Sequence, residues 1–500
     1  MKKVLNLMPV LAGVWLLSAC SSDSTPSPSS GGAGNATAGA TSASAGAPAA
    51  GAGAPGSAGA PSTGQAGAAN GGSAGAGGSV AVAGAANGGA AGSSTGAAGA
   101  GGASTGTAGG GAGGSTGATH WVGTWTASPY ATASDGMPPA SLANSVARQV
   151  THVSLGGSQI RVQFSNKEGK TPLTITAVHV ALCKKTPTVD GSIDTTTDKA
   201  VTFSGMAGVS VPAGMDMWSD AVDFALPALA NVSITTAFGT IPADITSHNG
   251  SRTTSYVQTN STNVSAADMT SAPSNAHWFF ISGMDVMASA DAKGIVAIGD
   301  SITDGRGTTT DGNNRWTDLL AARLQANAAT KNVSVMNQGI GATNLQGCNA
   351  TTDTCADKRF ARDVLGQSGV KYAVVFDGVN DIGGGGGTID NMKAAYAKMI
   401  SAAHGQSIKI YGVTIMPFGG DHDYWTADHE TLREAVNTYI KSGAFDGYID
   451  FEPVVSDGKS GTTMYEPALL ASTGTADGLH PGKDGYKAMS DSVDLTLFTK

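Results

Sequence analysis

The part of the chain after residue 118 shows two hydrophobic patterns in succession. Between residues 119 and 290, short runs of alternating apolar and polar side chains are separated by glycine, proline, asparagine and aspartate, which is the pattern of half-buried β-strands. The predicted strands lie at 150–155, 160–164, 173–182, 201–203, 209–211, 221–226, 232–238 and 278–281. So many short strands without helical periodicity predict a β-sandwich of the jelly-roll type, and the first two, joined across Gly156 and Gly157, predict a hairpin.

The region at 291–500 shows the second pattern, in which short all-apolar strands alternate with stretches of helical periodicity. The predicted strands lie at 295–298, 333–336, 372–376 and 408–415, and the predicted helices at 316–326, 392–403, 431–441 and 486–493. Strands without a polar face, alternating with helices, are typical of a parallel sheet covered on both faces. The sequence therefore predicts an α/β domain, in which an active site lies at the carboxyl ends of the strands.

The first 118 residues contain no candidate for a folded domain. Residues 21–118 consist almost wholly of Gly, Ala, Ser and Thr, with no Lys, Arg, Asp or Glu after Asp23. Such a segment cannot bury enough apolar surface to offset the entropy of ordering it, about 1–2 kcal/mol per residue. We expect a disordered linker, whose end-to-end distance as a Gly-rich coil is roughly 55 Å.

Residues 1–20 have the features of a targeting segment. Two lysines precede an apolar run at 7–17, which is short for a membrane span. The run ends in Leu-Ser-Ala-Cys, which resembles a bacterial lipoprotein signal, and this resemblance implies that Cys20 is freed by cleavage and acylated. An ordinary secretory signal is the alternative, and both imply export. Ser21, where Asp would favour the inner membrane, indicates an outer-membrane or cell-surface destination, with the choice between inner and outer membrane left open.

Cysteine usage adds one expected cross-link. Of the four cysteines, three remain when Cys20 is acylated. Cys348 and Cys355 close a short loop, so we expect a disulfide, which would contribute roughly 2.5 kcal/mol in the chain-entropy model. A metal site is the alternative for this pair, but no histidine or third cysteine is near in the sequence. Cys183 ends an apolar alternating stretch, which predicts an inert buried thiol.

Candidate catalytic side chains follow the predicted strands of the α/β region. Ser301 stands in a sharp turn after the first strand, where a nucleophile can be exposed near helix N–H groups. Asn380 follows the third strand, and a neutral amide donor there can stabilise an oxyanion as its charge develops. Asp477 can reach the ring of His480 and fix its tautomer and orientation. Each motif is common by chance, so the prediction of a serine hydrolase site rests on their combination.

With these motifs, the region from residue 294 to the last residue resembles the GDSL, or SGNH, hydrolase family, whose domain has a flavodoxin-like fold. The resemblance implies that Ser301 is the nucleophile, His480 the base and Asp477 the residue that orients it. It also implies an oxyanion hole that comprises Ser301, Asn380 and a backbone N–H from the segment 337–342.

That segment departs from the family pattern. The usual register places Ala342 where the family has glycine. Because the donor is a backbone N–H, which alanine also has, the oxyanion hole would be intact provided that position 342 does not need a positive φ. Whether Gly341 or Ala342 supplies the N–H is left open.

Two further segments resemble a two-domain subgroup of this family, in which a jelly roll precedes the hydrolase. Residues 121–129 resemble its opening, and residues 247–254 fit the junction between its domains. The subgroup is associated with carbohydrate esterases, including enzymes that remove acetyl groups from xylan. His422, Asp423 and His429 are candidate metal ligands, but they lack ligand spacing and we interpret them as part of a solvent-exposed rim loop.

We therefore expect a surface-tethered serine esterase that acts through an acyl-enzyme on an O-acetylated polysaccharide such as xylan, without a metal or organic cofactor. A lipase or arylesterase acting on small or lipid esters, and a non-catalytic carbohydrate-binding surface lipoprotein, are the alternatives. The expected partners are the ester substrate and the outer membrane, and a net charge of −9 without a basic block gives no support to a nucleic-acid role. The expected segments are a signal at 1–20, a linker at 21–118, a β-sandwich domain at 119–290 and a hydrolase domain at 291–500. The acyl group, the sugar, the oligomeric state and the role of the β-sandwich are left open.

Overall fold

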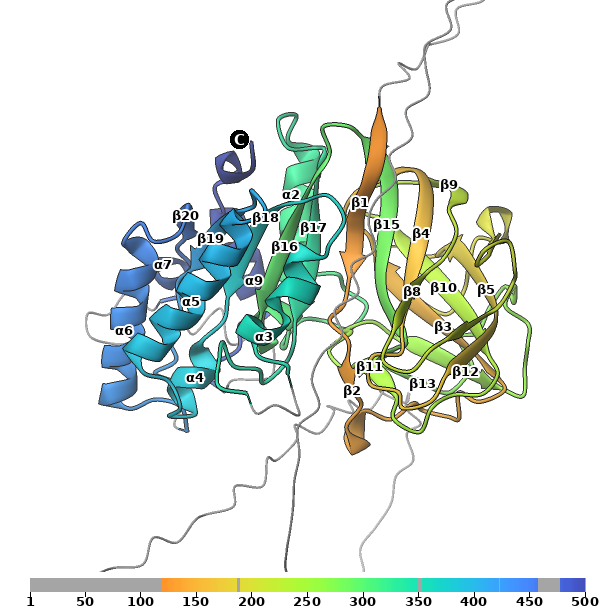
Figure 1. Ribbon diagram of the computed structural model, residues 1–500, viewed down its shortest axis with the longest axis horizontal. Coiled ribbons are helices and arrows are strands. Elements are labelled where there is room, and N and C mark those ends of the chain that lie inside the picture. The colour runs from red at the N-terminus through yellow and green to blue at the C-terminus, as the bar shows by residue number, and fades with distance from the viewer. Residues whose placement is uncertain (1–117, 187–188, 349–352, 422, 457–476, 500) are drawn as a thin grey trace, which may run out of the picture. The chain divides into compact units, whose positions relative to one another are not determined.

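The computed structural model describes residues 118–186, 189–348, 353–421, 423–456 and 477–499. The predicted signal with Cys20, and the predicted linker up to residue 117, lie outside these residues. None of the described helices has the length and apolar character needed to cross a membrane. The described residues form a β-rich region followed by an α/β region (Figure 1).

Antiparallel sheets make up the β-rich region. One sheet has the order β1 (Thr119–Thr126), β15 (Ile281–Ser289), β4 (Gly157–Ser165) and β8 (Asp216–Trp218), and β9 (Val222–Leu226) also pairs with β4. The second has the order β13 (Ser274–Asn275), β12 (Ser255–Thr259), β3 (Ser145–His152), β10 (Asn231–Phe238), β5 (Leu173–Leu182) and β6 (Lys199–Val201), and β7 (Val209–Val211) also pairs with β5. A third, small sheet contains β14 (Trp278–Phe279), β11 (Thr246–His248) and β2 (Tyr130–Ala131).

The period-two pattern explains how the two larger sheets pack. On β4, Ile160, Val162 and Phe164 are buried while the side chains between them remain partly exposed. These three residues share one hydrophobic core with Val232 and Ile234 of β10, in the second sheet. Two sheets that bury their inner faces against each other form a β-sandwich, as the sequence predicts. The connectivity of a jelly roll stays a prediction.

The predicted hairpin between residues 150–155 and 160–164 is wrong. β3 pairs with β10 and β12, whereas β4 pairs with β15, β8 and β9, so the two strands belong to different sheets. The segment between them is tied to β1, because the Ser154 N–H donates to the carbonyl of Thr124 over 2.9 Å. The alternation of apolar and polar residues shows which side chains of a strand are buried, but it does not show which strands pair. Two alternating strands joined by a short glycine-containing segment therefore look like a hairpin in the sequence even when they belong to different sheets.

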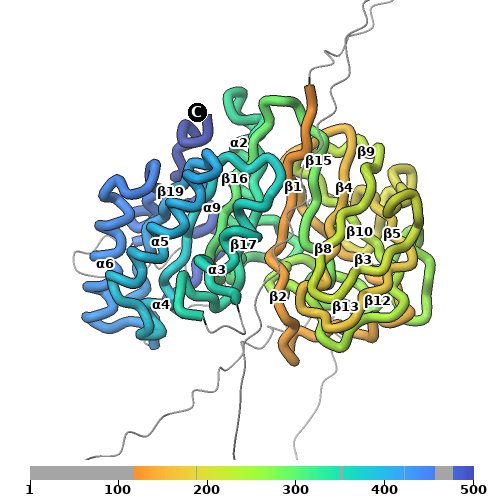
Figure 2. The backbone as a smooth tube through the Cα atoms, in the orientation of Figure 1, coloured from red at the N-terminus to blue at the C-terminus, as the bar shows by residue number. Residues whose placement is uncertain are grey.

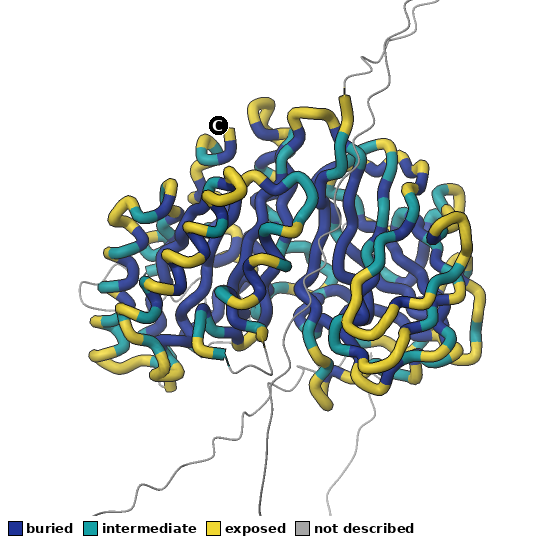
Figure 3. The backbone as a smooth tube through the Cα atoms, in the orientation of Figure 1, coloured by how far each residue is buried: buried dark blue, intermediate teal, exposed yellow. Residues whose placement is uncertain are grey.

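A five-stranded parallel sheet forms the centre of the α/β region. Its order is β17 (Val333–Gly339), β16 (Lys293–Gly299), β18 (Val370–Phe376), β19 (Lys409–Val413) and β20 (Gly447–Ile449). Figure 2 follows the backbone through these strands. The inner strands are buried without interruption from Ile295 to Ile298 and from Tyr372 to Phe376, which explains their all-apolar sequences (Figure 3). β20 was not predicted from the sequence, since it has only three residues.

Helices cover this sheet. They are α1 (Ser301–Asp304), α2 (Trp316–Ala326), α3 (Ala356–Phe360), α4 (Val379–Gly383), α5 (Ile389–His404), α6 (Ala427–Lys441), α7 (Glu452–Val455) and α9 (Lys483–Ser492). Short segments of other helix types are η1 (Ser134–Gly136), η2 (Thr195–Thr197), η3 (Ala361–Leu365) and η4 (Leu495–Phe498). Helix α5 packs beside α3 and α6, and α2 packs against α9. The predicted α/β fold is confirmed, and α2, α5, α6 and α9 correspond to the four predicted helices.

The β-rich region covers the edge of the parallel sheet at β17. The Val335 N–H donates to Ser154 Oγ over 2.9 Å, and Thr126 Oγ1 donates to the carbonyl of Asn337 over 3.2 Å. An uncovered edge strand presents unpaired N–H and C=O groups, which promote association with other strands. Hydroxyl groups of the β-rich region therefore satisfy backbone groups of β17 that no neighbouring strand pairs.

Candidate active site

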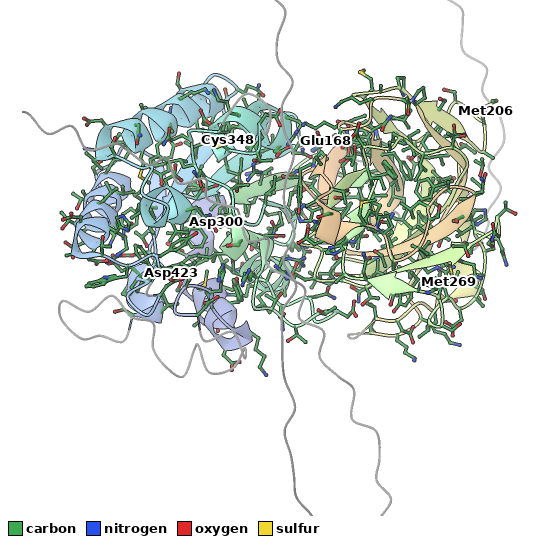
Figure 4. The ribbon with its side chains drawn as sticks, turned by 90° about the horizontal axis from the view of Figure 1, so that it is seen from below. Glu168, Met206, Met269, Asp300, Cys348 and Asp423 are labelled. Atoms are coloured by element: carbon green, nitrogen blue, oxygen red, sulfur yellow. A yellow bond between two sulfur atoms is a disulfide. The ribbon has the colours of Figure 1, made fainter. Side chains whose placement is uncertain are left out.

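Ser301 begins α1, one residue after the end of strand β16. Asp300 caps this helix, since its carboxylate accepts the Ile302 N–H over 2.9 Å (Asp300 is labelled in Figure 4). The helix ends after one turn at Gly305, where φ is 100°. This strand–turn–helix arrangement holds the Ser301 side chain at the carboxyl end of the sheet, as the sequence predicts.

Ser301, His480 and Asp477 form a continuous hydrogen-bonded chain. Ser301 Oγ lies 2.8 Å from His480 Nε2, and His480 Nδ1 lies 2.8 Å from Asp477 Oδ2. The Asp477 carboxylate can only accept, so Nδ1 carries the proton of a neutral ring and Nε2 is left to accept the Ser301 hydroxyl proton. The structure thus brings together three side chains separated by up to 179 positions.

The turn that carries Asp477 also holds the backbone of His480. Asp477 Oδ1 accepts the N–H groups of Leu479 over 3.0 Å and of His480 over 2.9 Å. Burial would raise the pKa of Asp477, but the hydrogen bonds and charge of His480 outweigh it and lower the pKa to about 2. A carboxylate that stays ionised can stabilise an imidazolium formed at His480.

The surroundings of His480 favour a neutral imidazole. Burial is the main cause that lowers the pKa of His480, and the positive charges of Arg306 and Arg252 act in the same direction. Asp477 opposes them through its charge and hydrogen bond, without reversing the shift. At neutral pH the ring is therefore able to take up a proton, which a general base must do.

Asn380 stands in the first turn of α4, directly after β18. Its Nδ2 donates to the carbonyl of Thr343 over 2.7 Å, and its Oδ1 accepts from the Tyr424 hydroxyl over 2.8 Å. An amide nitrogen carries two hydrogens, so one remains for another acceptor. β16, β17 and β18 are adjacent and in register, with Gly299 paired to both Gly339 and Phe376, so the segments that follow them meet at one edge of the sheet.

The segment after β17 lies beside the nucleophile. A side-chain carbon built on Gly341 would stand 3.5 Å from Asp304 Oδ2 and 4.0 Å from Ser301 Cβ, both ordinary van der Waals distances, so the backbone at 341 lies close to the nucleophile. Ala342 has φ of 59°, in the left-handed region. Position 342 therefore does need a positive φ, and alanine is strained there by about 1–2 kcal/mol. Alanine is thus not equivalent to the family's glycine at this position.

Three buried carboxyl groups follow β16 and β18, and the last of them is in α4. Burial raises the pKa of Asp300, Asp377 and Asp381, the last to about 6. The negative charges of Asp377's two neighbours raise its pKa further, whereas the Arg359 guanidinium opposes this shift. Arg359 itself donates to the carbonyls of Gly299 and Gln338, at the carboxyl ends of β16 and β17. This cluster is not predicted from the sequence, because Asp381 and Asp377 are close to Asp300 only in the folded chain.

The β-rich region contributes directly to the surroundings of Ser301. His248 Nε2, in β11, lies 3.0 Å from Asp304 Oδ1 in α1, and His248 Nδ1 lies 2.9 Å from the carbonyl of Ser128. Burial opposes ionisation of Asp304, but the charge and hydrogen bond of His248 are the main causes that lower its pKa. The segment 247–254 was expected at the junction of the two parts, whereas the pairing of His248 with Asp304 was not predicted.

The other residues predicted from the sequence are the cysteines and the candidate metal ligands. Cys348 and Cys355 form a disulfide with a Cα–Cα distance of 5.7 Å, and Cys183 is a buried free thiol. Within the described parts of the chain, no group of three or more His, Cys, Asp or Glu side chains is arranged to hold a metal ion. His422 lies outside those parts, and the ring of His429 donates from Nδ1 to the carbonyl of Tyr424 over 2.6 Å.

Residues 297–488 match the model of the GDSL-like Lipase/Acylhydrolase family. No curated protein matches the chain. Among solved structures, a putative lipolytic protein of the G-D-S-L family from Desulfitobacterium hafniense is 22% identical over 40% of this chain and 97% of its own, with a TM-score of 0.31. A putative acylhydrolase from Bacteroides fragilis is 20% identical over 42% and 89%, with a TM-score of 0.31. An acetylxylan esterase from Geobacillus stearothermophilus is 18% identical over 40% and 91%, also with a TM-score of 0.31.

Proposed function

Residues 297–488 form a GDSL-like hydrolase domain, and from this we propose that the protein is a serine esterase in which Ser301, His480 and Asp477 act as the catalytic triad. The observation that carries the proposal is the pair of 2.8 Å contacts that link Ser301 Oγ through His480 to Asp477. Ester hydrolysis through an acyl-enzyme requires a nucleophile within hydrogen-bond distance of a base, and a carboxylate that orients this base.

In the first step, Ser301 Oγ attacks the ester carbonyl carbon and passes its proton to His480 Nε2. The carbonyl oxygen becomes an oxyanion, which the free N–H of Asn380 and a backbone N–H of the segment 341–342 stabilise. When the tetrahedral intermediate collapses, the bond to the alcohol oxygen breaks and His480 returns the proton to that oxygen. The alcohol leaves, and the acyl group stays on Ser301.

In the second step, water takes the place of the alcohol. His480 Nε2 accepts a proton from the water as its oxygen attacks the acyl carbon, and the same donors stabilise the second oxyanion. Collapse breaks the bond to Ser301 Oγ, which recovers its proton from His480. The acid is released and the enzyme returns to its starting state.

The substrate class that we infer is an O-acetylated polysaccharide such as xylan. Five large apolar side chains are exposed among the described residues, and Met137, Met206, Met215, Trp425 and Tyr448 come from five separate loops or strands. Scattered apolar residues of this kind do not make the continuous apolar surface that binding to lipid requires. This favours a short acyl group over a lipid ester.

We also propose that the chain is exported and anchored through acylated Cys20, with residues 21–118 as a spacer that lets the enzyme reach a polymer. The support is the signal-like sequence of the first twenty residues and the composition of residues 21–118, which carry no charged side chain after Asp23. Cys20→Ser should move the protein from the membrane fraction to the soluble fraction of the cells that export it. Unchanged membrane association would contradict the anchor.

The esterase proposal is tested with the purified protein on acetylated xylan, acetylated pectin, 4-nitrophenyl acetate and 4-nitrophenyl esters of longer acids. We expect the highest kcat/KM for acetyl groups, loss of turnover in Ser301→Ala, and an unchanged rate in Ser442→Ala, which removes an exposed hydroxyl at the end of α6. A preference for long acyl chains would favour the lipase alternative. Full turnover in Ser301→Ala would place the nucleophile elsewhere.

A further inference from the structure

The amide of Asn380 is held from both sides, and one of its partners comes from a distant part of the chain. Thr343 presents a carbonyl oxygen, which can only accept, so the Asn380 nitrogen must face it at 2.7 Å. The amide oxygen then faces the hydroxyl of Tyr424, which donates to it over 2.8 Å. Tyr424 thus satisfies the end of the amide that takes no part in stabilising an oxyanion.

Tyr424 is itself fixed by the loop that precedes α6. Its N–H donates to Asp421 Oδ1 over 3.1 Å, and its carbonyl accepts from the ring of His429 over 2.6 Å. Its ring packs on Gly383 in α4, where a side-chain carbon would come within 2.0 Å of the ring. Both the backbone and the ring of Tyr424 are therefore fixed in place, and they direct its hydroxyl toward Asn380.

The same loop touches the turn that carries the catalytic histidine. A side-chain carbon on Gly478, between Asp477 and His480, would lie 2.1 Å from the carbonyl carbon of Gly420. Gly478 has φ of 76°, which together with this close approach accounts for glycine at the position. Gly420 therefore contacts the turn that carries the base, and Tyr424 contacts the helix that carries the amide donor.

A hydrogen bond received by the amide oxygen also affects the amide nitrogen. Donation by the Tyr424 hydroxyl polarises the amide and strengthens the hydrogen bonds that Asn380 Nδ2 donates. It also keeps the amide from rotating, so that the second Nδ2 hydrogen points in one direction before substrate binds. Donors oriented in advance are what makes oxyanion stabilisation effective.

We propose that Tyr424 is a positioning residue for the oxyanion hole, which acts through the amide of Asn380 without touching the substrate. The proposal rests on the esterase function proposed above. Because the oxyanion exists only in the transition state and intermediate, loss of the hydroxyl should lower kcat and leave KM nearly unchanged.

The test compares Tyr424→Phe with the wild-type enzyme on 4-nitrophenyl acetate. We expect kcat to fall about tenfold with a change in KM of less than about twofold. Tyr411→Phe is the matched control, since its hydroxyl donates to the carbonyl of Leu497 over 2.7 Å, away from Asn380, and its kcat should be unchanged. A kcat of Tyr424→Phe within twofold of wild type would overturn the proposal.

A double-mutant cycle separates positioning from a general structural effect. In the Asn380→Ala background, Tyr424→Phe should lower kcat by less than about twofold, because the amide through which it acts is absent. An undiminished tenfold loss in that background would show that Tyr424 acts by another route and would overturn the proposal. If Asn380→Ala itself kept full activity, the oxyanion role of Asn380 would fail first, which is a different outcome from failure of the Tyr424 step alone.

A second variant covers the case in which Tyr424→Phe folds poorly. Gly383→Ala keeps the hydroxyl but pushes the ring away from its place, because the added carbon meets the ring. We expect a similar loss of kcat, not additive with Tyr424→Phe. Full activity of a folded Gly383→Ala enzyme in which the Tyr424 ring is displaced would also overturn the proposal.

Discussion

His248 and Asp304 pair across the boundary between the β-rich and α/β regions, with His248 Nε2 3.0 Å from Asp304 Oδ1. Both side chains are about 5% exposed or less, and Asp304 lies on the same single-turn helix as Ser301. The second nitrogen of His248 contacts the carbonyl of Ser128, so the ring is held on both sides. The helix of the proposed nucleophile is therefore tied to the β-rich region by a buried pair.

His248→Ala should lower the free energy of unfolding by about 3 kcal/mol, because it leaves the buried Asp304 carboxylate without its partner. Denaturation in urea, followed by circular dichroism, measures this change. His404→Ala is the control, since His404 pairs with Asp446 over 2.9 Å but its side chain is 48% exposed. Exposed pairs contribute little, so that variant should stay close to wild type. Equal effects of both variants would contradict a structural role of the buried pair.

Ala342→Gly should raise the free energy of unfolding by up to about 1 kcal/mol, because glycine relieves the strain of about 1–2 kcal/mol at the φ of 59° but loses roughly 0.5–1 kcal/mol more backbone entropy on folding. The backbone N–H is retained, so kcat should change by less than about tenfold. Urea denaturation and steady-state kinetics measure the two effects. A less stable Ala342→Gly enzyme would mean that the left-handed conformation at 342 is not a source of strain.

Asp477→Asn should leave the fold intact and lower kcat by up to about 10⁴-fold, as wrong-tautomer changes do in serine triads. The reason is that an amide can donate to Nδ1, which places the His480 proton on Nε2, where it blocks uptake of the Ser301 proton. Kinetics together with a melting curve separate this effect from unfolding. A loss below tenfold would remove Asp477 from the orienting role.

The acid limb of the kcat/KM profile, where activity declines as the pH is lowered, should have its midpoint below pH 6.5, because burial and the charges of two arginines lower the pKa of His480. Activity needs the neutral ring, so it is lost as the pH falls through this lowered pKa. Arg252→Gln removes a positive charge, which favours the imidazolium and should shift the limb to higher pH. Lys371→Gln, which removes an exposed charge at the start of β18, should not shift it. A limb unchanged in Arg252→Gln would contradict its influence on His480.

Local patterns predicted most of the elements that position the site. β16 and β18 are buried on both faces, so their sequences are apolar throughout, and α2 follows its predicted bounds because its buried side chains recur at helical spacing. Ser301, Asn380, Asp477 and His480 stand in short motifs at strand ends or in a turn. These features depend on neighbouring residues, which is why they can be found without the tertiary structure.

Contacts between distant segments could not be predicted in this way. The pairing of β3 with β10 and β12, in place of a hairpin with β4, depends on which sheet each strand joins. Asn380 and Tyr424 are 44 positions apart, and His248 and Asp304 are 56 positions apart, with no sequence pattern that links either pair.

The sequence alone determined the two fold classes and the candidate triad, because hydrophobic periodicity and short motifs record what each segment buries and which chemistry it carries. Only the tertiary structure decided how that chemistry is held. It placed Ala342 at a positive φ, Tyr424 on the amide of Asn380 and His248 on Asp304. Each of these depends on the packing of segments far apart in the chain, and packing is a property of the whole fold.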